Sequence, residues 1–451
     1  MKPLRLASFG LRGFVGESLT PRAVIDFSSA FATFVEGRRV LLGRDTRYSS
    51  PMLHSAVTAG LVSAGCEVLD FGVCPTPLLQ FSVPRYAAAG AVSIGGGHNA
   101  MGWNALGLIG SDGAFLEPVG GEAVLDVFHA ADFRRCAWNE MGEVKEVEDY
   151  ASDYFAALAE HVDTDRIRGA HLIALIDPLG GAGCRFLESF ARQLGIAVLP
   201  INGEPSGYLA REAEPRPRSA LQMASMIAHV KGDVGFVLSS DMGRMSLVTE
   251  EGEPASEEYT FAVIAQHVLG KTSGPIVTNC CTTRTVDDIA AAHDAPVVRT
   301  RVGQAYVVSR LADEQGVLGG EGSGSAVLPA FSPAFDGFLM MALVLEAMAE
   351  RRVRLSELVS ELPRYHVVKR QVTCGSREGY RAMQWLEHKW QGEYDGTLDR
   401  TDGVRMDFED GWLHARVSMT EQMVRVISEA RDRDVAVDRA EKTIRFLEQE
   451  L

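Results

Sequence analysis

Four short segments combine glycine with polar or charged side chains, and each comes at the end of an apolar run that is typical of a buried strand. They begin at Ser93, Leu238, Gly319 and Arg416. Ligands of parallel α/β sheets bind where strands end, so these segments are the candidate binding or catalytic loops. Their histidine, carboxylates, arginines and hydroxyls are suited to binding an anionic ligand that carries hydroxyl groups.

The first segment reads Ser-Ile-Gly-Gly-Gly-His-Asn-Ala over residues 93–100. Consecutive glycines permit backbone shapes and a close ligand approach that side chains forbid, although a tight turn alone also explains them. His98 is a candidate for accepting a proton or a phosphoryl group, because an imidazole can act as a base or a nucleophile. Its presence alone does not assign it that role.

The second and third segments carry carboxylates. Residues 238–244 contain Asp241 and Arg244 but no second carboxylate. Because Mg²⁺ is usually held by one or two carboxylates and substrate phosphate, this segment predicts a poor magnesium site. In the third segment, Glu321 and Ser323 could bond to adjacent hydroxyl groups of a ligand. Runs of glycine and serine are also ordinary loops, so both interpretations stay open.

The fourth segment leaves a predicted strand at Arg416 and continues to Glu421. Arg416, Ser418 and Thr420 offer a guanidinium group and two hydroxyls, which can bind phosphate oxygens. A plain β-turn explains the same residues equally well, so the sequence leaves this choice open.

The elements that must position these segments alternate between helix and strand. Apolar residues recur at helical spacing from residue 21, and further apolar runs predict strands. The predicted strands include residues 40–42, 91–94, 171–176, 197–200 and 404–408. Three successive blocks of this kind predict three similar α/β/α domains with mixed sheets, followed by a smaller α+β domain. We expect an α/β fold with domains at residues 1–150, 151–253, 254–366 and 367–451.

Composition narrows the classes of function. The 451-residue chain is 46% hydrophobic and 23% charged, as ordinary globular proteins are, and its formal net charge is −16. That acidic balance argues against a nucleic acid or a membrane as partner. Seven scattered cysteines without Cys-x-x-Cys spacing argue against disulfides and a zinc site, and they favour the cytoplasm. We interpret the adjacent pair Cys280 and Cys281 as small apolar residues of a buried loop.

Taken in order, the four segments resemble those of the α-D-phosphohexomutase superfamily, which includes the phosphoglucomutases and phosphomannomutases. Shorter matching stretches lie at residues 43–47, 75–77, 177–178, 302–303 and 336–337. The resemblance implies a four-domain fold around a central cleft. It also implies substrate-binding roles for residues of the last three segments, namely Arg244, Glu321, Ser323, Arg416, Ser418 and Thr420.

The chain also departs from the family pattern. In the family, a phosphoserine in a Thr-Ala-Ser-His-Asn-Pro loop exchanges its phosphoryl group with the sugar, but here the serine position is Gly97, which has no hydroxyl. The metal loop Asp-Gly-Asp-x-Asp-Arg has become Ser-Ser-Asp-Met-Gly-Arg, so Asp241 is the one ligand-type residue left. Val15 and Gly107 stand where the resemblance implies an arginine and a lysine.

From these departures we expect a phosphosugar-binding protein that has lost ordinary phosphoserine-based mutase activity, a pseudoenzyme or regulator with no cofactor and no Mg²⁺. One alternative is an enzyme with changed chemistry on a phosphorylated sugar or sugar-like metabolite. Another is a scaffold associated with an active mutase. The expected partner is a sugar phosphate or a related phosphorylated small molecule, and the chain could also form a homo-oligomer or associate with another enzyme.

Overall fold

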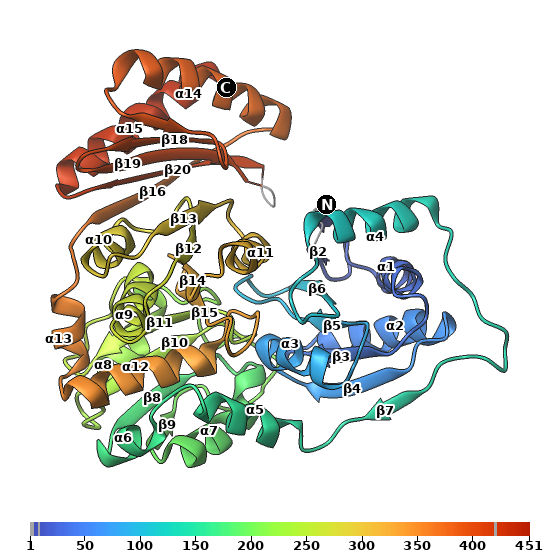
Figure 1. Cartoon of the computed structure of the whole chain (residues 1–451). Helices are drawn as coiled ribbons and strands as arrows, with labels where there is room; N and C mark the ends of the chain where they lie inside the picture. The colour runs from blue at the N-terminus through green and yellow to red at the C-terminus, as the bar shows by residue number, and fades with distance from the viewer. Residues whose placement is uncertain (1–3, 8–9, 419–421) are drawn as a thin grey trace.

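The computed structural model describes residues 4–7, 10–418 and 422–451 of the chain. Within these residues lie four sheets, each formed by its own stretch of sequence (Figure 1). We call the units that hold them domains I to IV, in chain order. Among the described helices, none combines the length and the apolar composition that crossing a bilayer requires.

Domain I contains the strands β1 (Arg5–Ala7), β2 (Gly10–Phe14), β3 (Val40–Arg44), β4 (Val68–Val73), β5 (Gly90–Ile94), β6 (Trp103–Gly110) and β7 (Val144–Glu146), and the helices α1 (Pro21–Phe34), α2 (Ser50–Ser63), α3 (Thr76–Arg85) and α4 (Pro118–Ala130). The strand order is β1-β2-β6-β5-β3-β4-β7. Side chains of a strand alternate between faces, so Val40 and Leu42 pack with α1 and α2 while Leu41 packs with α3.

Domain II contains α5 (Tyr150–Ala159), α6 (Thr164–Gly169), β8 (Ile173–Asp177), the 3₁₀ helix η1 (Ala182–Phe186), α7 (Leu187–Leu194), β9 (Ala197–Pro200), the 3₁₀ helix η2 (Pro217–Ala220), α8 (Leu221–Ile227), β10 (Val234–Leu238) and β11 (Met245–Thr249). Its strands follow the order β11-β10-β8-β9, in which β11 is antiparallel and the others are parallel. This mixed sheet agrees with the predicted fold class.

Domain III contains α9 (Glu257–Leu269), β12 (Ile276–Asn279), α10 (Thr285–Ala292), β13 (Val297–Thr300), α11 (Gln304–Glu314), β14 (Leu318–Glu321), β15 (Ser325–Val327), α12 (Gly337–Arg351) and α13 (Leu355–Ser360). Its strand order is β13-β12-β14-β15. Helix α12 is buried along almost its whole length. Asp336 caps this helix and accepts a hydrogen bond from the Tyr154 hydroxyl of α5 at 2.7 Å, which ties domain III to domain II.

Domains I to III share one connection. In each, a parallel strand turns back directly into an antiparallel neighbour: β5 into β6, β10 into β11, and β14 into β15. The loops between these strands are the first three segments in which the sequence predicts chemistry. The three predicted α/β/α blocks are therefore repeats of one topology, and the repeat places each loop at the equivalent strand end.

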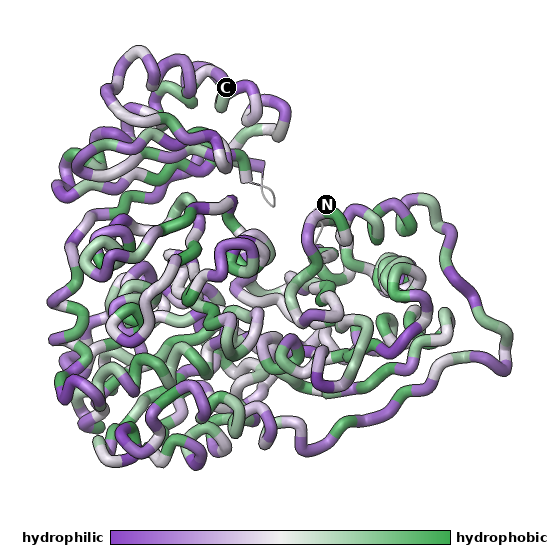
Figure 2. Tube along the Cα trace, viewed as in Figure 1, coloured by the Kyte–Doolittle hydropathy of each residue, from purple (hydrophilic) through white to green (hydrophobic). Residues whose placement is uncertain are grey.

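Domain IV contains β16 (His366–Thr373), α14 (Ser376–Glu393), β17 (Thr397–Asp399), β18 (Val404–Phe408), β19 (Gly411–Val417), β20 (Met423–Ala430) and α15 (Arg433–Glu450). Its sheet is antiparallel throughout, in the order β16-β20-β19-β18-β17. The two helices cover the outer face, and the other face is turned toward domain III (Figure 1). Figure 2 shows these helices alternating between hydrophilic and hydrophobic residues, as expected for helices with one buried side.

Candidate functional site

The glycine-rich loop at residues 95–100 follows β5 and is held by two buried side chains. Asp45 accepts a hydrogen bond from the Gly96 N–H at 3.0 Å. Arg47 donates to the carbonyl oxygens of Gly97 at 3.2 Å and Asn99 at 2.6 Å, and it pairs with Asp45 at 3.2 Å. The loop is therefore a turn, as predicted, and its carbonyl oxygens are fixed to the body of domain I.

Gly97 faces Asp241 of domain II. Its φ of +50° lies in the left-handed region, which favours glycine. A Cβ on residue 97 would lie 2.8 Å from Oδ2 of Asp241. The other carboxylate oxygen accepts hydrogen bonds from the Ser239 hydroxyl at 2.6 Å and the Gly243 N–H at 3.1 Å, and the Ser240 hydroxyl donates to the Gly97 carbonyl at 3.1 Å. The first and second predicted segments thus meet at this point.

His98, the next residue along, is surrounded by arginines. Its pKa lies well below the usual range, first because of the positive charge of Arg244, then because of burial, and then because of Arg12, Arg425 and Arg216. These side chains come from domains I, II and IV. The lowered pKa leaves the imidazole neutral near pH 7, beside Arg244 and Arg216, which both pair with Glu214, at 3.0 Å and 2.6 Å.

The sequence alone does not identify three of these arginines, Arg12, Arg216 and Arg425, as site residues. Arg12 lies in β2 and donates to Oδ1 of Asn99 at 3.4 Å, so domain I supplies a cation despite the loss implied at Val15. Arg425 lies directly opposite Arg416 on neighbouring strands. Like charges in such a pair repel each other, so negative charge beside them is favourable. Only the strand register reveals that the two arginines lie opposite each other.

The third and fourth segments are also ordered by local contacts. Glu321 is buried; its carboxylate accepts hydrogen bonds from the Gly303 N–H at 2.7 Å and the Ser323 hydroxyl at 3.3 Å. Arg416 has its Nε buried without a hydrogen-bond partner among the described residues. Ser418 is buried at the end of β19. The predicted phosphate-binding residue Thr420 lies outside the described residues.

Family models match three consecutive parts of the chain. They describe phosphoglucomutase/phosphomannomutase α/β/α domains I, II and III, and they match residues 6–135, 152–252 and 256–365. The chain is 34% identical over 452 residues to a phosphoglucomutase/phosphomannomutase of Thermococcus kodakarensis, covering 98% of both chains. It is 33% identical over 441 residues to a probable phosphoglucosamine mutase of Pyrococcus abyssi, covering 97% of this chain and 96% of the relative.

Solved structures share the same fold. A phosphoglucomutase/phosphomannomutase family protein of Burkholderia thailandensis has a TM-score of 0.86 at 21% identity, covering 98% of this chain and 97% of its own. A putative phosphomannomutase of Thermus thermophilus has a TM-score of 0.84 at 24% identity, covering 99% and 100%. The chain belongs to the phosphoglucomutase/phosphomannomutase family of the α-D-phosphohexomutase superfamily.

These relatives correct the expected function. The sequence predicts a pseudoenzyme, or at least not an ordinary phosphoglucomutase or phosphomannomutase, because Gly97 replaces the family's serine. That prediction is wrong: relatives that match nearly the whole chain are named as mutases. The missing hydroxyl alone is therefore no evidence that catalysis has been lost.

The expectation of no cofactor and no Mg²⁺ is contradicted as well. A structural relative, the N-acetylphosphoglucosamine mutase of Aspergillus fumigatus, has been solved with GlcNAc-6P and magnesium. The described residues of this chain also include two groups with metal-ligand spacing, Cys280 with Cys281 and His414, and His267 with Glu346 and Glu350. In the second group, Lys271 Nζ lies 2.6 Å from Glu346 and 3.1 Å from Glu350, so an ammonium group already neutralises these carboxylates.

Proposed function

We propose that the protein is a phosphohexomutase, an isomerase that moves the phosphoryl group of a hexose phosphate from one hydroxyl of the sugar to another. The observation that carries this proposal is the meeting of the His98 loop with Asp241 of domain II, where the Ser240 hydroxyl donates to the Gly97 carbonyl at 3.1 Å. Arginines of domains I, II and IV lower the pKa of His98 at the same place. Relatives named phosphoglucomutase/phosphomannomutase and phosphoglucosamine mutase support the same reaction class. Arginines around a transferring phosphoryl group stabilise the charge of the transition state.

His98 takes the place of the missing serine as the phosphoryl carrier. One imidazole nitrogen attacks the phosphorus of a hexose bisphosphate, a P–N bond forms, and the P–O bond to the sugar breaks. The departing sugar oxygen takes up a proton from water, and a hydroxyl of the next hexose phosphate later reverses these steps. A lowered pKa keeps the nitrogen lone pair free for attack at neutral pH.

Asp241 fits a magnesium ion at the same place. Its Oδ2 makes no hydrogen bond with a described residue and faces the space beside Gly97. Mg²⁺ is commonly held by one or two carboxylates, with substrate phosphate and water completing its shell. When bound, the ion would neutralise phosphate charge. Asp241 itself is kept in position by the Ser239 hydroxyl and the Gly243 N–H.

The remaining predicted residues serve the substrate. Arg416 and Arg425 face each other across β19 and β20, and a phosphate group between them would offset their repulsion. Ser418, Thr420 and Arg244 would bind further phosphate oxygens. The Ser323 hydroxyl donates to Glu321, so the Glu321 carboxylate and the Ser323 oxygen would both accept hydrogen bonds from sugar hydroxyls.

The proposed ligand is therefore a sugar phosphate, and structural relatives have been crystallised with GlcNAc-6P and with glucose 1,6-bisphosphate. The seven cysteines are free thiols, which supports a reducing compartment, and we assign the protein to the cytoplasm.

The reaction is tested by ³¹P NMR of the full-length protein with Mg²⁺. Glucose 1-phosphate, mannose 1-phosphate and glucosamine 1-phosphate are each supplied with a trace of the matching 1,6-bisphosphate. We expect the resonance of at least one 1-phosphate to be replaced by that of its 6-phosphate. If all three substrates remain unchanged under these conditions, the proposed function is overturned.

A further inference from the structure

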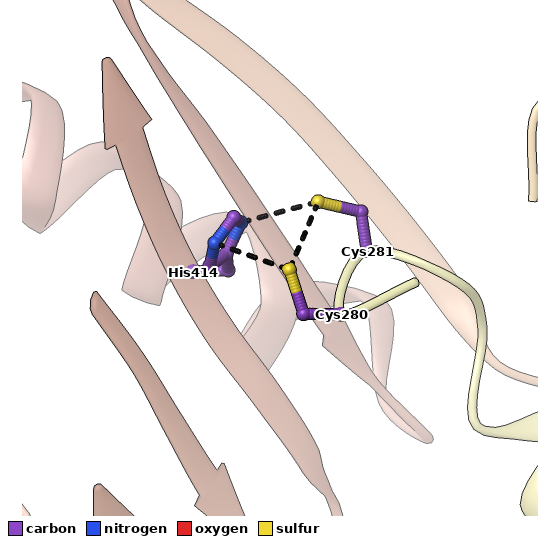
Figure 3. A group of neighbouring side chains, drawn as sticks. All are labelled: Cys280, Cys281 and His414. Carbon is purple, nitrogen blue, oxygen red and sulfur yellow. Dashed lines mark hydrogen bonds between the residues drawn. The ribbon is translucent and has the colours of Figure 1, made fainter. Parts of the chain in front are cut away.

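Cys280, Cys281 and His414 form a compact group between domains III and IV (Figure 3). The two Sγ atoms are 4.0 Å apart. Sγ of Cys281 lies 3.3 Å from Nδ1 of His414, and Sγ of Cys280 lies 3.7 Å from Nε2. Cys280 and His414 are buried, whereas Cys281 is partly exposed. The group is therefore preformed but reachable from solvent.

Local structure brings both thiols to the same side. Cys280 and Cys281 follow β12 in a turn, so the alternation of a strand does not send them to opposite faces. The Asn279 side chain fixes this turn by accepting a hydrogen bond from the Cys281 N–H at 2.8 Å, and Arg405 of domain IV donates to the Cys280 carbonyl. In Figure 3 both sulfur atoms point toward the imidazole of His414.

The hydrogen bond of His414 leaves one ring nitrogen for a ligand. Its Nε2 is 2.6 Å from the carbonyl oxygen of Asp402, which can only accept, so Nε2 carries a hydrogen. Nδ1 is then the nitrogen that faces Cys281. Metal-binding histidines usually donate their other N–H to a carbonyl or carboxylate in this way.

We propose that Cys280 Sγ, Cys281 Sγ and His414 Nδ1 bind one Zn²⁺ ion, with a fourth position open to water. Zn–S bonds of about 2.3 Å and Zn–N bonds of about 2.0 Å place tetrahedral ligand atoms roughly 3.5 to 3.8 Å apart. The observed separations of 4.0 Å and 3.3 Å bracket these values. Binding displaces the protons of the thiols to solvent, and it needs no redox change.

A zinc ion held by Cys280, Cys281 and His414 would fasten domain IV, which carries His414, to domain III.

The proposed site differs from the interpretation of the cysteine pair as small apolar residues of a buried loop. The sequence argues against zinc because it lacks Cys-x-x-Cys spacing, but the third ligand lies 133 residues beyond Cys281. Only the docking of β19 against the turn after β12 brings it there. None of its three residues has a role in the proposed mutase reaction, so failure of the zinc test would leave that proposal standing.

Calorimetric titration of the reduced, metal-free, full-length protein with Zn²⁺ tests the site. We expect one ion per chain, and Co²⁺ should give thiolate-to-metal charge-transfer absorption. Cys280→Ser, Cys281→Ser and His414→Gln should each weaken Zn²⁺ binding by at least about 100-fold. Cys374→Ser and Cys184→Ser are the matched controls and should bind as the unsubstituted protein does. Failure of the unsubstituted protein to bind one ion, or equal binding by all variants, overturns the proposal.

Alkylation supplies a test that does not depend on folding of a variant. Cys281 is the partly exposed thiol of the group, so iodoacetamide should modify it in the metal-free protein. One equivalent of Zn²⁺ should slow this modification at least about tenfold, because a metal-bound thiolate is shielded from attack. Peptide mass spectrometry measures the modified fraction, with Cys136 as the internal control. An unchanged rate at Cys281 contradicts the site.

Discussion

Asp241 approaches Gly97 so closely that a Cβ on residue 97 would lie 2.8 Å from its Oδ2 atom. Glycine suits this position because it leaves room for the Asp241 carboxylate of domain II. The left-handed backbone of Gly97 also favours glycine over residues with a side chain. A side chain at residue 97, such as a serine, would therefore disturb this contact.

Restoring the serine should therefore be harmful. Gly97→Ser forces a side chain into the left-handed region, which costs about 1 to 2 kcal/mol, and adds a close contact with Asp241. We expect a loss of at least about 2 kcal/mol in the free energy of unfolding, measured with urea, and lower mutase activity.

Gly72→Ser is the matched control for that substitution. Gly72 has a similar φ of +60°, but a Cβ there would have no other atom within 4 Å. Gly72→Ser should lower the free energy of unfolding only through the strain of its left-handed backbone. The decrease should therefore be smaller than that of Gly97→Ser. Equal losses would show that Asp241 does not crowd residue 97.

Substituting His98 by glutamine should remove the phosphoryl carrier while keeping the size of the side chain. We expect kcat to fall by about 100-fold or more, with little change in KM, because the ring nitrogen acts in the chemical step. A coupled enzyme assay of hexose 6-phosphate formation measures both kcat and KM. His388→Gln, on the exposed side of α14, should leave them unchanged. A His98→Gln variant with full kcat contradicts the assigned role.

Asp241→Asn tests the magnesium position. Replacing the carboxylate by a neutral amide removes its charge but keeps its shape, so the Mg²⁺ concentration needed for half-maximal activity should rise at least about tenfold. Asp126→Asn, on the exposed side of α4, is the control and should not change it. An unchanged Mg²⁺ requirement in Asp241→Asn would place the ion elsewhere.

The buried carboxylate of Glu346 should make the free energy of unfolding depend on pH. Burial opposes its charge, but hydrogen bonds from His267, Lys271 and the Asp163 N–H outweigh it and lower the pKa from 4.5 to about 2. Because the folded pKa is lower, this contribution of about 3 kcal/mol is present above pH 4.5 and is lost as the pH falls toward 2. The difference in unfolding free energy between the unsubstituted protein and Glu346→Gln should therefore shrink by about half between about pH 6 and pH 3.

Glu350→Gln is the control for that pH dependence. Glu350 also contacts Lys271, but its side chain is 36% exposed, so its ion pair should contribute less than about 1 kcal/mol. A difference for Glu346→Gln that stays constant over this pH range would contradict the account of the buried carboxylate.

The pattern of apolar residues predicts those helices and strands that have one buried, apolar face and one polar face. The strands β9 and β18 have the predicted bounds, and α1 begins at the predicted residue 21, capped by Thr20. The antiparallel strands β6 and β15 were not predicted. β6 contains Gly107 within its run, and β15 spans only Ser325–Val327, so neither shows a clear alternation.

The candidate site was predictable only in part. The loops of Gly97 and Asp241 stand out because glycine and carboxylate follow apolar strands. The arginines around His98 do not, since Arg12, Arg216 and Arg425 lie on separate domains and meet only after docking. The same reason hides His414 from Cys281: domain packing, and not local spacing, assembles both groups.

The acid and alkali stability of the phosphoenzyme identifies the residue that carries the phosphoryl group. The protein is incubated with a hexose 1,6-bisphosphate and Mg²⁺, and the intact mass is measured before and after acid or alkali. We predict one added phosphoryl group that acid removes and alkali spares, as expected for phosphohistidine, and that is absent from His98→Gln. A phosphoryl group that survives acid, or that remains in His98→Gln, would contradict the assignment of His98 as the carrier.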